Sequence, residues 1–330
     1  MKKLILIVVI QITHYTLFSQ NINKDNLNSL VQYCDSTKAD EVLISHKGKT
    51  IAHWKRNDFS SIQGRDNITE CQTPYMGTAS MVKSWTGVLI GILLDKGLIK
   101  HVDDLVCQYI PEWEIACKNK ITIKHLLTMT AGYKRLGGTG VLSQANMNEF
   151  VLHLKPDTLP GIRFAYSNES VQALGILIER VSGLKADEAF DKYLLNPMGI
   201  DSTNFTKDDF GNVLVYGGCT TTVANAHKMG VMMMNTGKFG DKQIVSEKWT
   251  TESTTPGDLA PYYGYLWWID KNSKYWNYAA TGDLGQMTIV YPQLQLVFVR
   301  RQSCDLSPAS RNMSWMGGDF LNRLISIVEK

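Results

Sequence analysis

The stretch GTASMVKSWTG, residues 77–87, places Ser80 and Lys83 three positions apart at the start of a strongly helical segment. This spacing puts both side chains on one face of the expected helix. The residues that follow, Val88–Leu94, are apolar on every side and indicate a buried helix. Burial would lower the pKa of Lys83 and let its neutral amine activate the weakly nucleophilic Ser80 hydroxyl. Ser80 is therefore a candidate nucleophile, and Lys83 is its candidate base.

The Ser-x-x-Lys spacing is weak evidence by itself, because the chain contains it twice. Ser182 and Lys185 have the same spacing, but Gly183 is expected to end the helix before them. We interpret this second pair as a helix C-terminus. For Ser80 the alternative is a helix N-cap beside a solvated lysine, and a second motif favours the catalytic interpretation.

The second motif lies in PGIRFAYSNES, residues 160–170, where Tyr166 and Asn168 alternate and so face one side. A phenol near the Lys83 ammonium can be held partly ionised and act as a second proton carrier. The amide of Asn168 can orient Lys83 and a substrate carbonyl. The alternative is a tyrosine that packs a loop and an asparagine that caps the next helix.

Hydrophobic periodicity divides the rest of the chain into sheet, helix and sheet again. Residues 24–38 indicate an amphipathic helix, and residues 41–56 indicate two strands joined by a turn. From Ser80 to Gly240 the periodicity is mostly helical, and a last helix is expected at about Gly318 to Val328. Between these helical regions, aromatic and β-branched runs predict strands at 262–269, 275–280, 286–292 and 295–300.

Short connections between consecutive strands favour antiparallel pairing, with the last helix covering one face of the sheet. We therefore predict an α+β fold, an antiparallel sheet flanked by N- and C-terminal helices with a large helical insertion. The sheet lobe would take about 21–75 and 241–330, and the helical lobe about 76–240. The hydrophobic share of 44% and the charged share of 20% are those of an ordinary globular protein.

Together these stretches resemble the penicillin-recognising serine hydrolases, namely class C β-lactamases, D-alanyl-D-alanine carboxypeptidases and the esterases related to them. Further segments resemble the family's landmarks in the family's order, including ITIKHLLTMTAGY at 121–133 and GGCTTTVANAHKMG at 217–230. The resemblance covers roughly residues 25–330. It implies a β-lactamase/transpeptidase-like fold for one hydrolase domain at 21–330.

The resemblance also implies roles for the residues of the two motifs. Ser80 would be the acylated nucleophile, and Lys83 and Tyr166 would share proton transfer. Asn168 would contact the substrate. No cofactor and no metal belong to this chemistry.

The family's third motif, Lys/His-Thr/Ser-Gly, is where this chain departs from the pattern. The best candidate is Ala280-Thr281-Gly282-Asp283, in which the cation is missing. In the family this position helps to hold the carboxylate of a β-lactam or of a peptide terminus, so Ala280 argues against both substrates. Thr281 and Gly282 remain candidates for substrate binding, and the backbone N–H groups of Asp283 and Ser80 would form the oxyanion hole.

Composition and other motifs exclude several classes of function. The formal charge of +3 falls to +1 without Lys2 and Lys3, which does not favour nucleic acid as a partner. The six cysteines form no Cys-x-x-Cys pair, and the seven histidines show no paired-ligand spacing, so a metal site is not expected. Disulfides are possible, and buried thiols are an equally good interpretation. The Gly-x-Ser-x-Gly elbow of α/β-hydrolases is absent.

The first twenty residues have the layout of a secretory signal. Two lysines precede an apolar run from Leu4 to Ile12, followed by a more polar end near Gln20. The run is shorter than the ~20 residues that span a bilayer. We expect residues 1–20 to be removed, leaving a periplasmic or secreted protein with no stable membrane insertion.

These observations predict a serine hydrolase that acts on a small ester, amide or peptide-like substrate, and an esterase or amide hydrolase is the first hypothesis. A class C-like β-lactamase or D-alanyl-D-alanine carboxypeptidase is the alternative, and a non-catalytic binding protein on the same fold is a third possibility. Tyr133, Trp267 and Trp268 could line an apolar acyl pocket, with core packing as the alternative for at least one tryptophan.

Overall fold

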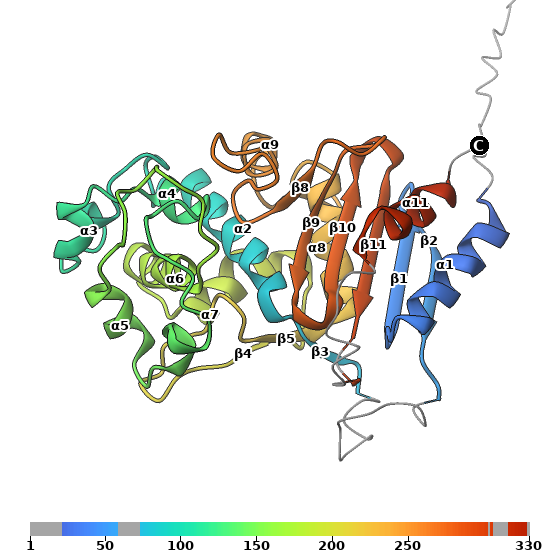
Figure 1. Ribbon diagram of the computed structural model, residues 1–330, viewed down its shortest axis with the longest axis horizontal. Coiled ribbons are helices and arrows are strands. Elements are labelled where there is room, and N and C mark those ends of the chain that lie inside the picture. Colours follow the sequence, from blue (N-terminus) through green and yellow to red (C-terminus); the bar gives the residue numbers. More distant parts are fainter. Residues whose placement is uncertain (1–21, 59–72, 303, 306–315, 329–330) are drawn as a thin grey trace, which may run out of the picture.

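The computed structural model describes residues 22–58, 73–302, 304–305 and 316–328. The expected signal segment 1–20 lies outside the described residues. Figure 1 shows a sheet lobe, which contains both ends of the described chain, beside a lobe made mainly of helices. The helix α2 (Val82–Asp95) runs between them.

A six-stranded antiparallel sheet, in the order β2-β1-β11-β10-β9-β8, forms the sheet lobe. Its strands are β1 (Glu41–His46), β2 (Lys49–Lys55), β8 (Trp268–Asp270), β9 (Asn277–Gly282), β10 (Gln286–Tyr291) and β11 (Leu296–Arg301). The register of β1 and β11 places Glu41 opposite Arg301. Strands from the two ends of the chain therefore meet in the middle of one sheet.

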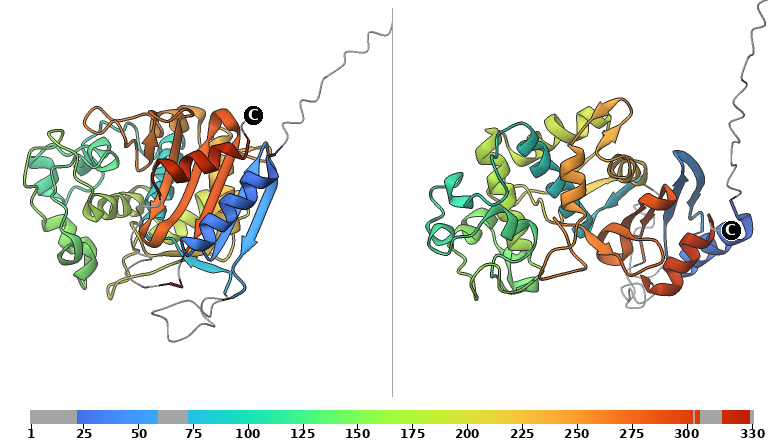
Figure 2. Two further views of the ribbon diagram at one scale, coloured as in Figure 1. Left: turned by 45° about the vertical axis from the view of Figure 1, so that its right-hand side comes forward. Right: turned by 90° about the horizontal axis from the view of Figure 1, so that it is seen from above.

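Both faces of the sheet are covered, because successive side chains of a strand point to opposite faces. Phe298 of β11 packs on one face against Phe320, with ring centroids 5.4 Å apart. Phe320 belongs to α11 (Gly318–Ser326), which lies beside α1 (Lys24–Ser36) on this face (Figure 2). Helix α8 (Val223–Met234) packs against β10 and β11. The predicted α+β fold with terminal helices over an antiparallel sheet is confirmed.

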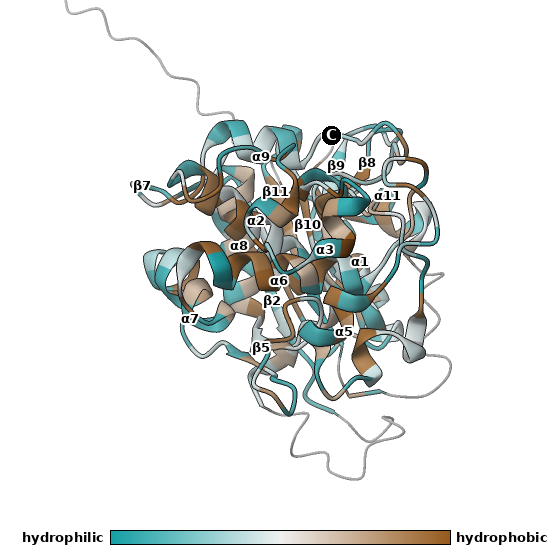
Figure 3. Cartoon of the chain, turned by 90° about the vertical axis from the view of Figure 1, so that its left-hand side faces the viewer, coloured by the Kyte–Doolittle hydropathy of each residue, from teal (hydrophilic) through white to brown (hydrophobic). Residues whose placement is uncertain are grey.

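The helical lobe is built around α2 and α6 (Asn168–Ser182), which pack against each other. Every residue of α2 from its first to Leu93 is buried, as the run of apolar residues predicted. Figure 3 colours much of α6 as hydrophobic in the middle of this lobe. The shorter helices are α3 (Glu114–Lys118), α4 (Ile123–Leu127), α5 (Met147–His153), α7 (Ala186–Phe190) and α9 (Glu247–Ser253).

The described residues also form small sheets outside the large one. The first has the order β3-β5-β4 and the second is the hairpin β6-β7. These strands are β3 (Tyr75–Gly77), β4 (Asn204–Phe205), β5 (Cys219–Thr222), β6 (Lys238–Phe239) and β7 (Lys242–Gln243). Helix α8, which falls inside the range 76–240 expected for the helical lobe, has its main contacts with the large sheet.

The strand predicted at 262–269 is wrong for most of its length. Only its last two residues belong to β8, and the preceding residues form turns. Leu266 has a φ of +62°, which is incompatible with a strand. Tyr263 and Trp267 are buried, at 2% and 0% exposure, although they lie outside a regular strand, whereas Tyr262 is 48% exposed. Burial of aromatic residues in turns therefore produces a sequence pattern that resembles a strand.

Cysteines serve both of the purposes left open by the sequence. Cys107 and Cys117 form a disulfide in the helical lobe, whereas Cys34 and Cys219 are buried free thiols. Among the described residues, no helix is both long and apolar enough to cross a membrane.

Candidate active site

Ser80 lies in a short 3-10 turn, Ala79–Met81, just before α2. It precedes the α-helix instead of lying in its first α-helical turn as expected. Ala79 has a φ of +46°, a left-handed conformation that costs a non-glycine residue roughly 1–2 kcal/mol. The neighbouring Thr78 is held firmly, because its N–H and its Oγ1 both donate to the carbonyl of Cys219, at 2.8 and 3.0 Å. Pairing of β3 with β5 thus fixes the turn that presents Ser80.

The amino group of Lys83 reaches the serine directly. Its Nζ lies 2.9 Å from Ser80 Oγ and donates to the carbonyl of Tyr216 at 2.6 Å. Lys83 is only 1% exposed, and burial lowers its pKa to about 7, although the carboxylates of Asp283 and Glu169 act in the opposite direction. A large fraction of Lys83 is therefore neutral near pH 7 and able to accept the serine proton.

Tyr166 approaches Ser80 from a group of aromatic rings. It stacks on Trp268, with centroids 5.6 Å apart, and packs edge-on against Tyr263 at 6.2 Å. Its hydroxyl is hydrogen-bonded to Ser80, and Lys83 Nζ lies 5.1 Å from the centre of its ring. The three predicted catalytic side chains therefore meet at one point.

The expected partial ionisation of Tyr166 is wrong. Burial raises the pKa of this phenol above its ordinary value of 10, and this effect exceeds the opposite effect of the hydrogen bond to Ser80. The ammonium of Lys83 was expected to favour the phenolate. Burial instead favours the neutral amine of Lys83. Tyr166 is consequently a neutral hydroxyl that can pass a proton on.

Gly282 ends β9 against the turn that carries the serine. A Cβ at this position would lie 2.4 Å from the Thr78 carbonyl oxygen and 3.1 Å from the Ser80 nitrogen. No side chain can be accommodated at that separation without moving the backbone. The glycine of the third motif therefore lets β9 approach the nucleophile.

The other residues of the third motif divide between core and cavity. Ala280 is completely buried in the hydrophobic core, whereas Thr281 is half-buried and faces the cavity that Ser80 lines. Asp283, in the turn after β9, also lines this cavity. The structure thus brings together all the residues predicted for oxyanion and substrate binding.

Asn168 lies at the same cavity but does not cap α6. The cap is Ser167, whose Oγ accepts the N–H of Ser170 at 3.1 Å. Asn168 is the first residue of the helix and leaves its amide at the cavity wall. The capping alternative considered for Asn168 is therefore wrong by one residue.

The cavity has a volume of about 440 Å³. Trp268 lines it, but Tyr133 and Trp267 lie in the hydrophobic core and do not. The complete lining consists of Ser80, Arg135, Leu136, Gly137, Leu142, Tyr166, Ser167, Asn168, Glu169, Trp268, Thr281, Gly282 and Asp283. Of the three aromatic residues expected at an acyl pocket, the structure places only Trp268 there.

The other Ser-x-x-Lys match has no such setting. Gly183 adopts a φ of +68° and ends α6, so Ser182 is the last residue of the helix. The Ser182 hydroxyl donates to the carbonyl of Ile178 at 2.6 Å, and Lys185 forms an ion pair with Glu179. The interpretation of this pair as a helix C-terminus is confirmed.

The arrangement of serine, buried lysine and tyrosine agrees with the comparison of the chain with known families. The model of the family described as Beta-lactamase matches residues 35–312. The chain belongs to the β-lactamase family. It is therefore a serine hydrolase of that family, as its sequence motifs predicted.

Relatives of this β-lactamase-family chain carry different names. The 6-aminohexanoate-dimer hydrolase of Paenarthrobacter ureafaciens is 25% identical over 84% of this chain and 76% of its own length. Two solved structures share the fold. The octameric penicillin-binding protein homologue from Pyrococcus abyssi has a TM-score of 0.68 and 21% identity, covering 87% of this chain and 74% of that chain. EstCE1, a hydrolase with promiscuous acyltransferase activity, has a TM-score of 0.69 and 15% identity, covering 92% and 98%.

Two charged residues of this β-lactamase-family site were missed in the sequence. Arg135 reaches the cavity from the segment after α4, and Glu169 reaches it from the first turn of α6. Glu169 is only 2% exposed, and its Oε1 accepts the N–H of Val141 at 3.0 Å. Its position directly after Tyr-Ser-Asn was the one available signal, whereas nothing in the sequence distinguished Arg135 from other surface cations.

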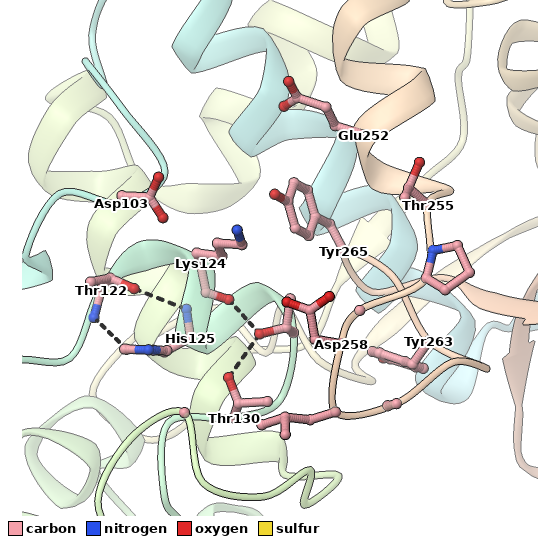
Figure 4. A pocket seen from close by; sticks show the side chains of 16 residues that line it. Asp103, Thr122, Lys124, His125, Thr130, Glu252, Thr255, Asp258, Tyr263 and Tyr265 are labelled. Carbon is pink, nitrogen blue, oxygen red and sulfur yellow. Dashed lines mark hydrogen bonds between the residues drawn. The ribbon is translucent and has the colours of Figure 1, made fainter.

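A larger cavity, of about 620 Å³, lies outside the predicted site (Figure 4). Asp103, Lys124, His125 and Glu252 are among its lining residues, and none of the predicted catalytic residues is. His125 has a structural role, since it exchanges hydrogen bonds with Thr122 at the start of α4. Across the described ranges, no group of three or more His, Cys, Asp or Glu residues could hold a metal ion.

Proposed function

We propose that the protein hydrolyses a small ester or amide through an acyl-enzyme formed on Ser80. Lys83 is the general base, and Tyr166 carries a proton between the serine and the leaving group. The observation that carries this proposal is the 2.9 Å separation of Lys83 Nζ and Ser80 Oγ, in a setting that lowers the lysine pKa to about 7. A solvated lysine at helical spacing would not have this property.

In the first half-reaction Ser80 Oγ attacks the substrate carbonyl carbon while its proton passes to the neutral Lys83 amine. The developing oxyanion would be stabilised by the N–H groups of Ser80, in the turn before α2, and of Asp283, in the turn after β9. The carbon–leaving-group bond then breaks, and the proton that Lys83 took from Ser80 passes through Tyr166 to the leaving group. In the second half-reaction water attacks the acyl carbonyl carbon, its proton passes by way of Lys83 and Tyr166 to Ser80 Oγ, and the acyl group leaves as a carboxylic acid.

The cavity and the relatives both favour a small ester or amide as the substrate. A volume of about 440 Å³ suits a small molecule. One relative is named for an amide-type dimer and one solved structure for hydrolase and acyltransferase activity. The missing cation at Ala280 disfavours β-lactams and peptide termini, so ester and amide hydrolysis ranks above the β-lactamase and carboxypeptidase alternatives.

Mass spectrometry of the purified protein after brief exposure to p-nitrophenyl butyrate, a fluorophosphonate or a penicillin tests the proposal. We expect the ester and the fluorophosphonate to add mass at Ser80, and we expect Ser80→Ala to remain unlabelled. Ser84→Ala is the matched control, because that hydroxyl is buried on the same helix and donates to the Leu266 carbonyl at 2.6 Å. This control should still be labelled at Ser80.

The outcomes separate the alternatives. A penicilloyl adduct on Ser80 would favour the β-lactamase or carboxypeptidase alternative over the esterase. Equal labelling of wild type and Ser80→Ala, or none in either, would refute the acyl-enzyme and leave a binding protein on this fold.

A further inference from the structure

We propose that Arg135 binds a carboxylate of the substrate, so that the preferred substrates are esters or amides that carry a free carboxyl group. This inference rests on the proposed hydrolase function and makes its substrate class more specific. Ala280 stands at the position of the third motif where the family has a cation. It is buried and offers no charge to the cavity. A cation is nevertheless present, on the segment after α4 and not on β9. It would hold a carboxylate at a different place from the third-motif position that in the family receives the carboxylate of a β-lactam or of a peptide terminus.

Arg135 is the only Lys or Arg among the described residues that line the cavity. It shares that lining with Ser80, Tyr166 and Thr281 and has an exposed side chain. No described carboxylate forms an ion pair with it. The guanidinium is therefore available to a ligand, and its planar fork matches a carboxylate with two parallel hydrogen bonds.

The adjacent cation shows the contrast. Lys134 forms an ion pair with Asp157, with Nζ 3.4 Å from Oδ1, and it does not line the cavity. Its backbone N–H donates to the other oxygen of Asp157 at 3.0 Å. Of two neighbouring positive charges, one is neutralised within the protein and the other is left at the site.

The segment that carries Arg135 is tied down on both sides. Asp157 holds it at residue 134, and the buried Glu169 accepts the Val141 N–H. Gly140 lies so close to Glu169 that a Cβ there would be 2.2 Å from its Oε1. These carboxylates fix the backbone around Arg135 instead of pairing with its side chain, which is the arrangement expected for a binding residue built into a site.

The charge of Arg135 acts on the reacting groups. Burial is the main cause of the low pKa of Lys83, and Arg135 lowers that pKa further. Arg135 also opposes the burial effect that raises the pKa of Tyr166. A substrate carboxylate bound to Arg135 would therefore lie within electrostatic reach of the atoms that react.

The test compares two esters that differ in charge. p-Nitrophenyl butyrate is neutral, whereas the mono-p-nitrophenyl ester of glutaric acid carries a carboxylate at the end of its acyl chain; 4-carboxyphenyl butyrate carries it on the leaving group. The kcat/KM of each is measured for wild type, Arg135→Gln, Arg135→Lys and the matched control Lys134→Gln. The ratio of anionic to neutral ester is the readout, because any effect of Arg135 on Lys83 alters both esters together.

We expect wild type to prefer one of the anionic esters, and we expect Arg135→Gln to lower that preference about tenfold or more, mainly through KM. Arg135→Lys should keep part of the preference, and Lys134→Gln should keep all of it. Added salt should reduce the preference of wild type but not that of Arg135→Gln. An equal ratio in wild type and Arg135→Gln, for both anionic esters, would overturn the inference.

A binding measurement separates this inference from the hydrolase proposal. Calorimetric titration of the glutarate ester and of 4-carboxyphenyl butyrate into Ser80→Ala and into Ser80→Ala/Arg135→Gln needs no turnover. Tighter binding of either ester to the first variant supports the role of Arg135 even if wild type hydrolyses no ester, a result that would refute the proposed function alone. Equal affinities of the two variants for both esters, with active wild type, would refute only the role of Arg135.

Discussion

Lys83 is buried on all sides, and no carboxylate of the described residues lies in direct contact with its amino group. Its Nζ has two oxygen neighbours, one on Ser80 and one on Tyr216. Removing an ammonium from water without a paired anion favours the neutral amine. The ability of Lys83 to activate Ser80 therefore depends on its burial, which favours the neutral amine.

The pH dependence of acylation should follow this residue. Because the amine must be neutral to take the serine proton, the kcat/KM for p-nitrophenyl butyrate should rise with pH and reach half of its plateau near pH 7. The ordinary lysine pKa of 10.5 would instead give a rise that continues above pH 9. A stopped-flow measurement from pH 5 to 10 distinguishes the two curves.

Lys83→Met supplies the control for that profile, because it keeps an unbranched apolar stem in the buried site and removes the base. Acylation should fall by roughly 10²–10⁴-fold, the usual contribution of a general base. A profile that is flat between pH 6 and 8 in wild type, or a Met variant that acylates normally, would show that Lys83 is not the base.

At the scale of elements, the site depends on the close approach of β9 and the turn before α2. Gly282 permits that approach, because a Cβ there would meet the Thr78 carbonyl oxygen, Ala79 Cβ and the Ser80 nitrogen. The first and the last are backbone atoms, and a Cβ is fixed to the backbone, so none of the three can rotate away. The distance between the nucleophile and the end of the strand is therefore sensitive to a single methyl group.

Gly282→Ala should separate β9 from the serine turn. Overpacking of this kind costs about 1–3 kcal/mol of stability, and we expect a larger effect on kcat than that loss explains, because the predicted oxyanion donor at Asp283 moves with the strand. Thermal unfolding and esterase kinetics of the same preparation measure both effects.

Gly77→Ala is the matched control, since a Cβ at Gly77 would meet nothing within 4 Å. It should leave the kcat of the enzyme close to wild type. If Gly282→Ala turned over esters as fast as Gly77→Ala, the backbone of the third motif would have no part in catalysis.

Elements with long regular periodicity were predictable, and the packed turns were not. The buried helix after Ser80 and the final helix were found from their apolar patterns, which reflect regular backbone geometry. The run at 262–269 failed because aromatic residues buried in turns, such as Tyr263, produce the same pattern as a strand. Gly282 was found as part of a motif, but its contact with the serine turn depends on pairing between distant segments.

The candidate site divides in the same way. Ser80, Lys83 and Tyr166 were predictable because the Ser-x-x-Lys and Tyr-x-Asn spacings can be recognised in the sequence. Arg135 was missed because its place at the cavity is fixed by Asp157 and Glu169, which hold its backbone segment from outside. Such a position follows from tertiary contacts that no local pattern encodes.

At the scale of the whole molecule, we propose that the protein is exported and loses residues 1–20. The disulfide between Cys107 and Cys117 supports an oxidising compartment, because cytosolic thiols are generally kept reduced. The layout of residues 1–20, with positive charge, an apolar run and a polar end, also supports export.

Expression of the full chain in a bacterial host tests this proposal. The protein recovered from the periplasm or the medium should have an intact mass that begins near residue 21. Val8→Glu should block export by interrupting the apolar run, whereas Val9→Leu should not. Recovery of the full-length chain in the cytoplasm, with wild type and Val8→Glu alike, would contradict the proposal.

The pairing of β1 with β11 has a consequence for the order in which the molecule can form. A ribosome or a translocation channel releases Glu41 of β1 long before its partner Arg301 of β11, so the centre of the sheet stays open until β11 has emerged. Contacts between such distant residues slow folding and leave strand edges exposed meanwhile. Helices α2 and α6, by contrast, can pack as soon as α6 has been synthesised. The helices that support Ser80 would then be in place before β9, the strand that completes its site.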